Sequence, residues 1–519
     1  MNRIDTEAFR LRRFVEALVE AGECDVHDQP TDLIDLGAAL DCNTKAVWFR
    51  AAGPERAEVA GNIMGSRKRL ALALGTDERG FPAKLRHGIE HPIAPVEIPA
   101  ADAPVQEIVL TGDDADFAAL PVHLQHALDG APYISAGIDF ARDPRTGATN
   151  IGCRRIMLRG CKSAGVDLNA PSDLRAIYQD MVAKGEKLPM AFAVGSHPAD
   201  FLAALAVTPP LDELHVMGGV RGGPVPVVKC ATIDLRVPAD AELVLEGYLD
   251  PRGLVEPEGP YGEYIGYYGM MKRNPVFHLT AITRRRDALF QTVTIGGKLI
   301  GRTDTAQLGA AKTEAAVWSV LRLAIREPVA VCCTGSSGGM YNVRLSLKQR
   351  YPGEARNAIA AVFCSTADVK HVIVVDEDVD VFSDEQVDWA LATRFQADRD
   401  LVVASGFRAV PLDPSLAGSR TGAKAGFDCT KPFGKADGFD YDVPLPPVLP
   451  PSTTAQRPRR SVEAVLAEGP ATYLDLMTAL GTRDGREILP IIEQLYAAGM
   501  LGRLDDGRYA LISPPPGSS

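Results

Sequence analysis

The sequence predicts a mixed α/β protein with a β-barrel at its centre. Two regions, before about residue 105 and after about residue 315, alternate amphipathic helical patterns with short apolar runs typical of buried strands. The region between them holds many short apolar runs separated by Gly and Pro, which favours a barrel or a split sheet. We therefore expect the α/β (α+β) class, with an N-terminal α/β part, a central split β-barrel domain, a C-terminal α/β part and a small winged-helix-like appendage.

Residues 1–104 form the expected N-terminal α/β domain. Residues 7–22 have apolar side chains at helical spacing, residues 46–49 resemble a short buried strand, and residues 67–74 resume a helical pattern. The stretch from 91 to 104 is rich in proline, so we interpret it as a connector.

Residues 105–315 form the expected split β-barrel domain. Its predicted strands are short apolar runs at 133–139, 151–158, 190–194, 227–235, 276–284 and 289–295. Helices are predicted at 172–184 and near 198–206.

Residues 316–443 form the expected C-terminal α/β domain, with strands at 328–333 and 371–375 and a helix at 384–395. A proline-rich segment at 444–458 shows little helical or strand pattern and is predicted to be an extended linker.

Residues 459–519 form a separate module in which three helices precede a hairpin. The helices are predicted at 462–467, 474–480 and 488–498, and the hairpin at 501–511 contains a turn-forming Asp-Gly. This order resembles a winged helix, but from Arg459 onward six Lys and Arg stand against eight Asp and Glu. Because no basic face is available in bulk, we favour an interaction or oligomerisation module over DNA binding.

Bulk composition excludes several classes of protein. The net charge of −12 argues against a general nucleic-acid or anionic-membrane binder, although a local basic pocket for a phosphate fits. Nine cysteines, an odd number without a C-x-x-C pair, favour a reducing compartment. The first residues are charged and no apolar run approaches the roughly 20 residues that span a bilayer. We expect a cytoplasmic protein with no membrane and no nucleic-acid partner.

The most informative motif is Glu258-Gly-Pro-Tyr-Gly-Glu263, which places two carboxylates around turn-forming residues. Pro260 fixes its own φ and the two glycines permit turns, so a loop that aims both acids at one small volume is expected. Two carboxylates that share a site tend to divide into one proton donor and one permanent anion. The alternative is a simple turn that carries two solvated acids.

A second motif, Asn150-x4-Arg155, lies on a predicted strand. Side chains an odd number of residues apart leave opposite faces of a regular strand, unless a bulge at Gly152 changes this. Taken alone, Arg155 could equally be a surface cation.

Further motifs follow in a fixed order, and with them the chain resembles the UbiD family of reversible, non-oxidative decarboxylases that use prenylated FMN. The resemblance runs from about residue 8 to about residue 435. The motifs that carry it are Asn62–Arg67, Asn150–Arg155, Leu211–Leu214, Val228–Cys230, Glu246-Gly247, Glu258–Glu263, Val375–Asp380, Trp389–Arg394 and Asp428–Thr430.

The resemblance implies an Arg–Glu–Glu network of Arg155, Glu258 and Glu263 around the modified flavin, which makes 105–315 the flavin-binding domain. Glu263 would protonate the carbon that loses carbon dioxide, and Arg155 would hold the substrate carboxylate beside Glu258. An Arg fork suits a carboxylate, and the electron sink that the reaction needs exceeds what side chains offer. A flavin prenyltransferase would supply the cofactor.

The resemblance also implies that a divalent Mn²⁺ or Mg²⁺ and a K⁺ hold the flavin phosphate. Asn150 and Glu213 match two of the family's metal ligands, but the third, a His, is missing from this chain, so Ser172 or Asp173 would replace it. Lys424 is a candidate phosphate contact, although a solvated loop lysine is the alternative. His197 lies too far along the chain to replace the missing ligand and is interpreted as structural.

The implied activity is that of a carboxy-lyase acting on an aromatic, heteroaromatic or α,β-unsaturated carboxylic acid. The segment 296–302 is expected to border the substrate pocket, where Lys298 and Arg302 would suit a second anionic group, as in a diacid or an acyl-CoA acid. A homodimer or homohexamer, formed through the C-terminal α/β part, is also implied. The alternatives are a non-catalytic flavin-binding regulatory protein and a docking subunit of a multi-protein carboxylase.

Overall fold

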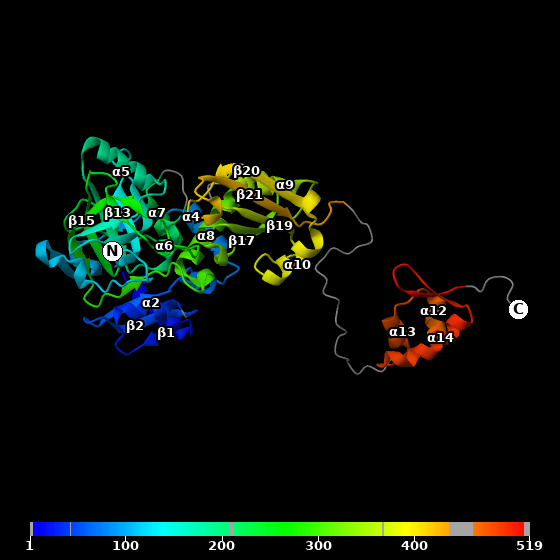
Figure 1. Cartoon of the computed structure of the whole chain (residues 1–519). Coiled ribbons are helices and arrows are strands. Elements are labelled where there is room, and N and C mark those ends of the chain that lie inside the picture. Colours follow the sequence, from blue (N-terminus) through cyan, green and yellow to red (C-terminus); the bar gives the residue numbers. More distant parts are fainter. Residues whose placement is uncertain (1–3, 42, 207–210, 366–367, 435–459, 513–519) are drawn as a thin grey trace. The chain divides into compact units, whose positions relative to one another are not determined.

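The computed structural model describes residues 4–41, 43–206, 211–365, 368–434 and 460–512, and the predicted linker at 444–458 lies outside them. The chain divides into two compact units, residues 1–443 and 444–519 (Figure 1). Each unit has a hydrophobic core of its own, so each is described by itself.

The N-terminal part of the larger unit is a four-stranded sheet in the order β1-β2-β3-β16, with helices packed around it. Its last strand comes from far along the chain, because β16 pairs in parallel with β3. The run predicted as a barrel strand at 289–295 is therefore shorter and belongs to this sheet. The elements are α1 (Leu11–Glu20), β1 (Cys24–His27), α2 (Leu36–Asp41), β2 (Ala46–Ala52), β3 (Ala57–Gly61), α3 (Arg67–Ala73), α4 (Phe81–Glu90) and β16 (Phe290–Thr292).

The central part is a closed barrel of six strands in the order β12-β9-β6-β7-β8-β15, with β15 returning to β12. This confirms the predicted mixed α/β fold with a barrel. A seventh strand, β5 (Ile108–Thr111), extends the sheet at β15. The barrel strands are β6 (Tyr133–Arg142), β7 (Thr149–Leu158), β8 (Ser163–Val166), β9 (Leu188–Val194), β12 (Leu243–Leu249) and β15 (Val276–Arg284).

Smaller elements surround the barrel. A three-stranded sheet contains β4, which forms inside the predicted proline-rich connector and pairs in parallel with β10, and β10 ends at Lys229, earlier than predicted. The remaining elements are β4 (Val96–Glu97), α5 (Asp173–Lys184), α6 (Pro198–Ala204), α7 (Glu213–Arg221), β10 (Pro226–Lys229), β11 (Arg236–Pro238), β13 (Glu256–Glu258) and β14 (Lys272–Asn274).

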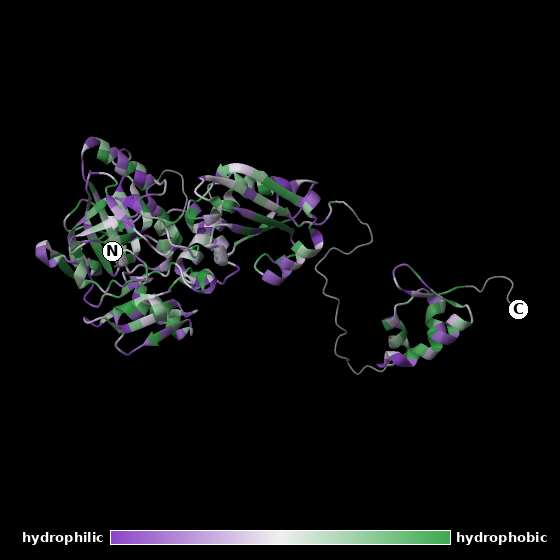
Figure 2. Cartoon of the chain, in the orientation of Figure 1, coloured by the Kyte–Doolittle hydropathy of each residue, from purple (hydrophilic) through white to green (hydrophobic). Residues whose placement is uncertain are grey.

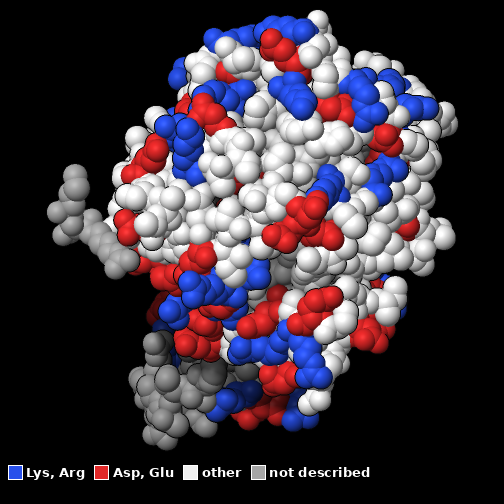
Figure 3. All heavy atoms as spheres, turned by 90° about the vertical axis from the view of Figure 1, so that its left-hand side faces the viewer, with Lys and Arg blue, Asp and Glu red and all other residues white. Residues whose placement is uncertain are grey.

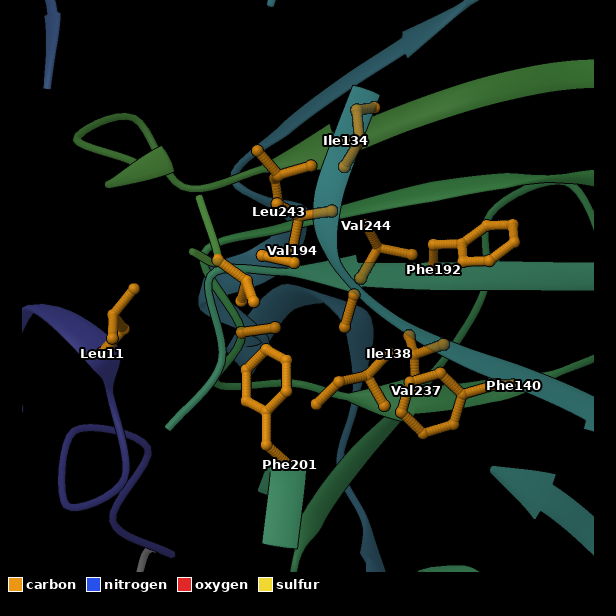
Figure 4. Packing of buried hydrophobic residues seen from close by; sticks show 14 of the residues in the cluster. Leu11, Ile134, Ile138, Phe140, Phe192, Val194, Phe201, Val237, Leu243 and Val244 are labelled. Carbon is orange, nitrogen blue, oxygen red and sulfur yellow. The ribbon is translucent and has the colours of Figure 1, made fainter. Parts of the chain in front are cut away.

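The barrel core is apolar and continuous with the packing of the neighbouring helices. Figure 4 shows Phe140, Phe192 and Val244 on barrel strands and Phe201 on α6, all members of one apolar cluster. All of these side chains are buried. Figure 2 shows the same pattern at lower magnification, with hydrophobic strands inside and hydrophilic residues on the outer helices. Burial of this kind stabilises by about 25 cal/mol per Å² of apolar surface, so the core fixes the strands that carry the polar site.

An open edge of β7 creates room for a ligand. Strand β8 pairs with β7 only from Ile156 to Leu158, so residues 149–155 pair with no strand on that side. Their backbone instead contacts single residues, because the Thr149 and Ile151 N–H groups donate to the side chains of Asp212 and Glu213, and the Arg155 carbonyl accepts from the Asp167 N–H. The bulge considered at Gly152 does not form there, because Gly152 pairs in register with Asp139. The register shift lies instead in β6, where two residues oppose Arg155. Since β7 stays regular, Asn150 and Arg155 leave opposite faces of the strand, and Arg155 is the one of the two that lines a cavity.

The C-terminal part of the larger unit is a five-stranded sheet in the order β17-β18-β19-β21-β20. The long helix α8 connects it to the barrel and packs against both α4 and β17 (Figure 1). Its elements are α8 (Asp304–Ala324), β17 (Pro328–Cys333), β18 (Asn342–Leu347), α9 (Glu354–Phe363), β19 (His371–Asp376), α10 (Asp384–Arg394), α11 (Ala397–Asp400), β20 (Leu401–Arg408) and β21 (Thr421–Asp428).

The smaller unit contains three helices and a hairpin, at the positions that the sequence predicts. A capping box formed by Thr472 and Asp475 begins its second helix. The hairpin strands pair from Leu501 with Leu511 to Arg503 with Tyr509. The elements are α12 (Val462–Glu468), α13 (Tyr473–Leu480), α14 (Leu489–Ala497), β22 (Leu501–Arg503) and β23 (Tyr509–Leu511).

Two general surface properties bear on partners. Among the described residues, no helix has both the length and the apolar character needed to cross a bilayer. On the face shown in Figure 3, acidic and basic side chains are interspersed.

His197 lies in the core, as its structural interpretation requires, and it predicts a pH dependence of stability. The side chain caps α6 by accepting a hydrogen bond from the Ala199 N–H at 3.2 Å. Burial, and then the charge of Arg221, lowers the pKa of His197 from 6.5 to about 3. The unfolded chain therefore takes up this proton at a higher pH than the folded unit does. The contribution of His197 to the free energy of unfolding is therefore fully present above pH 6.5. Between pH 6.5 and pH 3 it falls by about 1.4 kcal/mol for each pH unit.

We expect His197→Asn, which keeps a hydrogen-bond acceptor, to flatten this dependence. Urea unfolding at pH 7 and pH 5.5, followed by tryptophan fluorescence, measures it, because all three tryptophans lie within residues 1–443. The native protein should lose about 1–1.5 kcal/mol more than the variant over this interval. An equal loss in both proteins would contradict the assignment.

Candidate active site

The two carboxylates of the Glu258–Glu263 loop are buried and point to one place. Glu258 ends β13, and the chain then turns at Gly259, whose φ of +98° favours glycine. The side chains of Glu258 and Glu263 are only 1% and 2% exposed. A surface turn that carries two solvated acids is therefore excluded.

Both carboxylates contact Arg155 of β7. Arg155 Nε lies 2.9 Å from Glu258 Oε1, and Nη1 lies 3.2 Å from Glu263 Oε1. A third acid, Asp167, lies 3.0 Å from Nη2. Burial alone would lower the pKa of Arg155, but the three carboxylates raise it well above its ordinary value. The alternative of a surface cation is thus wrong for Arg155.

Lys272 is the second cation of this cluster. Its Nζ lies 3.4 Å from Glu263 Oε1 and 3.8 Å from Asp167 Oδ2. Burial would raise the pKa of Asp167, but Arg155 and then Lys272 overcome burial and lower it. The cluster therefore sets two cations against three carboxylates, Asp167, Glu258 and Glu263.

Two tyrosines form the wall behind Arg155. The guanidinium lies over the ring of Tyr261, 4.5 Å from its centroid. The hydroxyl of Tyr133 donates a hydrogen bond to Glu258 Oε1 at 3.1 Å, and the two tyrosine rings lie 4.3 Å apart. These contacts fix the orientation of Arg155 and exclude water from one side of the ion pairs.

A neighbouring loop holds the Glu258–Glu263 turn from outside. Asp129 accepts a hydrogen bond from the Gly262 N–H at 3.0 Å, and the Gly130 N–H donates to the Pro260 carbonyl at 2.8 Å. The ring of His126 packs so closely on Gly262 that a Cβ there would lie 2.4 Å from Nδ1. Only glycine permits this approach, which explains the residue type at position 262.

Glu263 lies between two cavities, and Ile295 also lines both. The smaller cavity, of about 300 Å³, lies beside Arg155 and the open edge of β7 and is also lined by Tyr261 and Lys312 of α8. The larger, of about 480 Å³, lies beside the N-terminal part. The segment predicted to border the substrate pocket lines the larger cavity with Gly296, Gly297, Lys298, Leu299 and Arg302.

The structure also brings together Asn150 and Glu213, the two predicted metal ligands. Asn150 Nδ2 lies 3.1 Å from Glu213 Oε2, which also accepts a hydrogen bond from the Ile151 N–H. Burial, with smaller contributions from Asp139, Asp173 and Asp212, raises the pKa of Glu213 to about 7. Both carboxylate oxygens of the buried Asp139 lack a hydrogen-bond partner. The nearest cation to Asp139 is Arg154, whose Nε lies 3.6 Å from Asp139 Oδ1 without a hydrogen bond.

Asp173 and Ser172, the candidates for the third metal ligand, form no contact with Asn150 or Glu213 like the one that joins those two residues. Asp173 is the exposed first residue of α5, and its charge acts on Glu213 without a contact. Ser172 caps α5 and accepts a hydrogen bond from Arg154 Nη2 at 3.2 Å. Within the described residues, no three His, Cys, Asp or Glu side chains converge into a metal-type cluster. The ligand that replaces the missing His stays a prediction.

Lys424 is not brought to either cavity lining. It lies on β21, where its Nζ donates a hydrogen bond to the Phe363 carbonyl at 3.0 Å, and burial lowers its pKa. Its role as a phosphate contact stays a prediction. Lys312, which no motif had indicated, lines the smaller cavity together with Arg154 and Arg155.

Two family models match the larger unit of this chain. Residues 96–298 match the family model of the 3-octaprenyl-4-hydroxybenzoate carboxy-lyase Rift-related domain, UbiD, and residues 306–429 match the C-terminal domain of the same carboxy-lyases. Together these matches cover more than half of the chain.

The chain belongs to the UbiD family.

Relatives of this family match nearly the whole larger unit. Anhydromevalonate phosphate decarboxylase of Aeropyrum pernix is 33% identical over 388 residues, which are 74% of this chain and 84% of that protein. The UbiD-class enzyme HmfF from Pelotomaculum thermopropionicum, solved in complex with FMN, has a TM-score of 0.79 and 32% identity, over 84% of this chain and 97% of that chain. An evolved dimeric form of HmfF in complex with prFMN has a TM-score of 0.75 and 31% identity, with the same coverage.

Membership of the UbiD family confirms the resemblance and makes the chain a carboxy-lyase. The structure unites the three residues that the family motif indicated, Arg155, Glu258 and Glu263. It adds Asp167 and Lys272, which lie outside any motif. Lys272 has a local signal, because β14 pairs with β13 in a short hairpin and sets Lys272 opposite Glu258. Asp167 has none, since only the fold brings it to Arg155.

Proposed function

We propose that this UbiD-family protein is a reversible, prenylated-FMN-dependent decarboxylase with Glu263 as its proton donor. The observation that carries the proposal is the position of Glu263, which is buried between two cavities and paired with Arg155. A cofactor in one cavity and a substrate in the other would both reach this carboxyl group.

The smaller cavity fits the flavin. It offers Arg155 and Tyr261 at one end, while Arg154 and Lys312 line it as cations suited to a phosphate. Asn150 and Glu213 are oxygen ligands for Mn²⁺ or Mg²⁺, with K⁺ beside them. A bound cation would supply a further partner for the Asp139 oxygens, which accept no hydrogen bond, and would oppose the burial and the neighbouring acids that raise the pKa of Glu213. When bound, the prenylated flavin supplies the electron sink for the bonding pair left when carbon dioxide departs.

The charge balance of the cluster suggests a separate role for each residue, in which Arg155 would bind the substrate carboxylate and Glu263 would carry the proton. Every side of the Arg155 guanidinium faces a carboxylate in the structure. Two cations against three carboxylates leave one excess negative charge, which one proton on Glu263 would cancel. A neutral Glu263 would release Nη1, and the substrate carboxylate would take its place as a charge-assisted partner.

Glu263 then acts as a general acid. After carbon dioxide leaves, its proton passes to the carbon that carried the carboxylate, and Glu263 returns to Arg155 and Lys272 as an anion. Glu258 keeps its contacts throughout, because Arg155 and the Tyr133 hydroxyl both donate to it. In the reverse direction Glu263 removes the same proton, so carboxylation under high bicarbonate uses the same groups.

The larger cavity suits an acid that carries a second anionic group. Tyr267 and Tyr268 provide aromatic walls, while Lys298 and Arg302 provide cations. Neither cation forms an ion pair with a described residue, and both are exposed. We propose an aromatic, heteroaromatic or α,β-unsaturated acid of this kind, such as a diacid or an acyl-CoA acid. The substrate in the name of the Aeropyrum relative carries a phosphate, which fits the same pair of cations.

We expect Lys298→Gln combined with Arg302→Gln to raise the KM for a dianionic substrate about tenfold, equivalent to about 1.4 kcal/mol. A monoacid of the same carbon frame should show no change, because it lacks the group that the two cations would bind. Steady-state kinetics with the matched pair of acids measures this. Lys162→Gln, at an exposed lysine paired with Asp113, is the control. An equal rise for both acids would contradict the assignment.

The experiment that tests the function uses the full chain co-expressed with a flavin prenyltransferase, with Mn²⁺ and K⁺ supplied. Absorbance and intact mass identify the bound cofactor, and carbon dioxide release is measured over a panel of monoacids, diacids and acyl-CoA acids. Prenylated FMN with release from at least one acid is expected. Bound cofactor without release from any acid would instead favour the regulatory or docking-subunit alternatives.

A further inference from the structure

A groove rich in arginine lies on the surface between α4 and α8, which pack against one another (Figure 1). Its volume is about 640 Å³. Three arginines line it, one from α4 and two at and beyond the end of α8, and Trp318 forms its floor. We call it the arginine groove and define it by Arg86, Arg322, Arg326 and Trp318.

The arginines of this groove are poorly compensated. Arg86 and Arg326 form no ion pair with a described residue, and Arg322 pairs with Glu90 through side chains that are 57% and 53% exposed. The other acid in the lining, Glu327, pairs with Arg350 instead. The Arg86 guanidinium lies 4.1 Å from the Trp318 ring centroid. Burial, and then repulsion by Arg322, keeps the pKa of Arg86 below its ordinary value, so an anion beside these groups would be favoured.

A narrow space lies between the arginine groove and the smaller cavity beside Arg155, and it shares lining residues with both. This space, of about 50 Å³, shares Arg86 and Glu90 with the groove. The same space shares Leu308, Lys312 and Ala316 of α8 with the smaller cavity beside Arg155.

Cations lie one after another between the arginine groove and the end of β7 that carries Asn150. Lys312 follows Arg86, is exposed, and forms no ion pair with a described residue. Arg154 is the next cation after Lys312 on this route. Both lie near Cys153, because the charge of each opposes the rise that burial causes in the pKa of its thiol. Arg154 Nε also lies 3.6 Å from Asp139 Oδ1, and Asp139 pairs with Gly152, two residues along β7 from Asn150, which contacts Glu213. An anion that enters at the groove would thus meet positive charge at every step.

We propose that the arginine groove captures the phosphate end of the flavin and is the port through which the cofactor enters its cavity. The inference rests on the proposed function, which places the flavin in the smaller cavity. The ligand class is a phosphate monoester attached to an aromatic ring system. The narrow space is smaller than that ring system, so passage requires α4 to part from α8 around Leu85 and Ile89, which line it. The positive electrostatic field of a cleft lined with cations raises the association rate of an anionic ligand by about 10- to 1000-fold, and salt screens this effect.

The test is the rate at which the metal-supplied, cofactor-free full chain takes up FMN, followed by the change in flavin fluorescence. The triple variant Arg86→Gln, Arg322→Gln, Arg326→Gln should take up FMN about tenfold more slowly at low salt. Because the groove lies on the route and not at the final site, release should slow by a similar factor and the Kd should stay the same. The difference should disappear in about 0.5 M salt, where screening is strong.

Two controls separate the port from other causes. Riboflavin lacks the phosphate, so its uptake should be equal in the native protein and the triple variant. Arg13→Gln, Arg145→Gln, Arg399→Gln removes the same charge from side chains that are 60%, 60% and 64% exposed elsewhere, and should leave FMN uptake unchanged. The port proposal would be overturned if the groove variant took up FMN as fast as this control variant. It would also be overturned if the groove variant slowed the uptake of riboflavin as much as that of FMN. Failure of the native protein to bind FMN at all would overturn the cofactor assignment and the port with it.

Discussion

Replacing Glu263 by Gln is expected to lower the rate of decarboxylation by about a thousandfold, the range in which a lost general acid falls. Glutamine keeps the shape of the side chain and can still occupy the space between the two cavities. It has no proton of suitable acidity to give to the carbon that loses carbon dioxide. Because the neutral amide also stops competing for Arg155, substrate binding should be kept or improved, so the loss falls on kcat and not on KM.

The measurement is kcat and KM for carbon dioxide release by protein whose bound cofactor has been quantified by absorbance. Glu256→Gln, two residues before Glu258 on β13, makes the same chemical change outside the cluster and is the control. It should retain activity within about twofold. A Glu263→Gln variant with full cofactor content and native kcat would remove Glu263 from the role of proton donor.

The sequence indicated the residues of this site that lie in compact motifs. Glu258 and Glu263 are five residues apart, and the glycine and proline residues between them predict a turn. Arg155 and Asn150 share one strand, so their pairing with the acids and with Glu213 followed from the family motif. The mixed α/β fold with a barrel was predicted for a similar reason, because short apolar strands are a local signal.

What the sequence missed depends on contacts between distant segments. Asp167 joins Arg155 only because β8 leaves β7 after a short pairing, and Lys312 reaches the cofactor cavity only because α8 packs beside it. Strand β16 was assigned to the barrel because an apolar run does not reveal its partner, which is β3. The register shift beside Arg155 lies in β6 and not at Gly152, since a glycine in a strand permits a bulge without requiring one.

Replacing Arg155 by Met is expected to destabilise the larger unit by about 3–5 kcal/mol, the usual cost of removing one partner from a buried ion pair. The side chain is 13% exposed, and its removal leaves Glu258, Glu263 and Asp167 with Lys272 as their only cation in the cluster. Activity should fall below detection, because no group remains to hold the substrate carboxylate. Urea unfolding followed by tryptophan fluorescence measures the stability, since every tryptophan lies within residues 1–443.

The pH dependence of this loss tests whether uncompensated charge is its cause. Arg155 opposes the effect of burial on the pKa of Asp167, so in the variant burial raises that pKa, and the uncompensated carboxylate takes up a proton as the pH falls, which restores part of the lost stability. The deficit of Arg155→Met should therefore be largest near pH 7 and smaller near pH 4.5. Arg159→Met, at the exposed residue after β7, should change stability by no more than about 0.5 kcal/mol at either pH. A deficit that is independent of pH would assign the loss to the packing of Arg155 against Tyr261, and ion pairing with the three carboxylates would then not be what holds this site together.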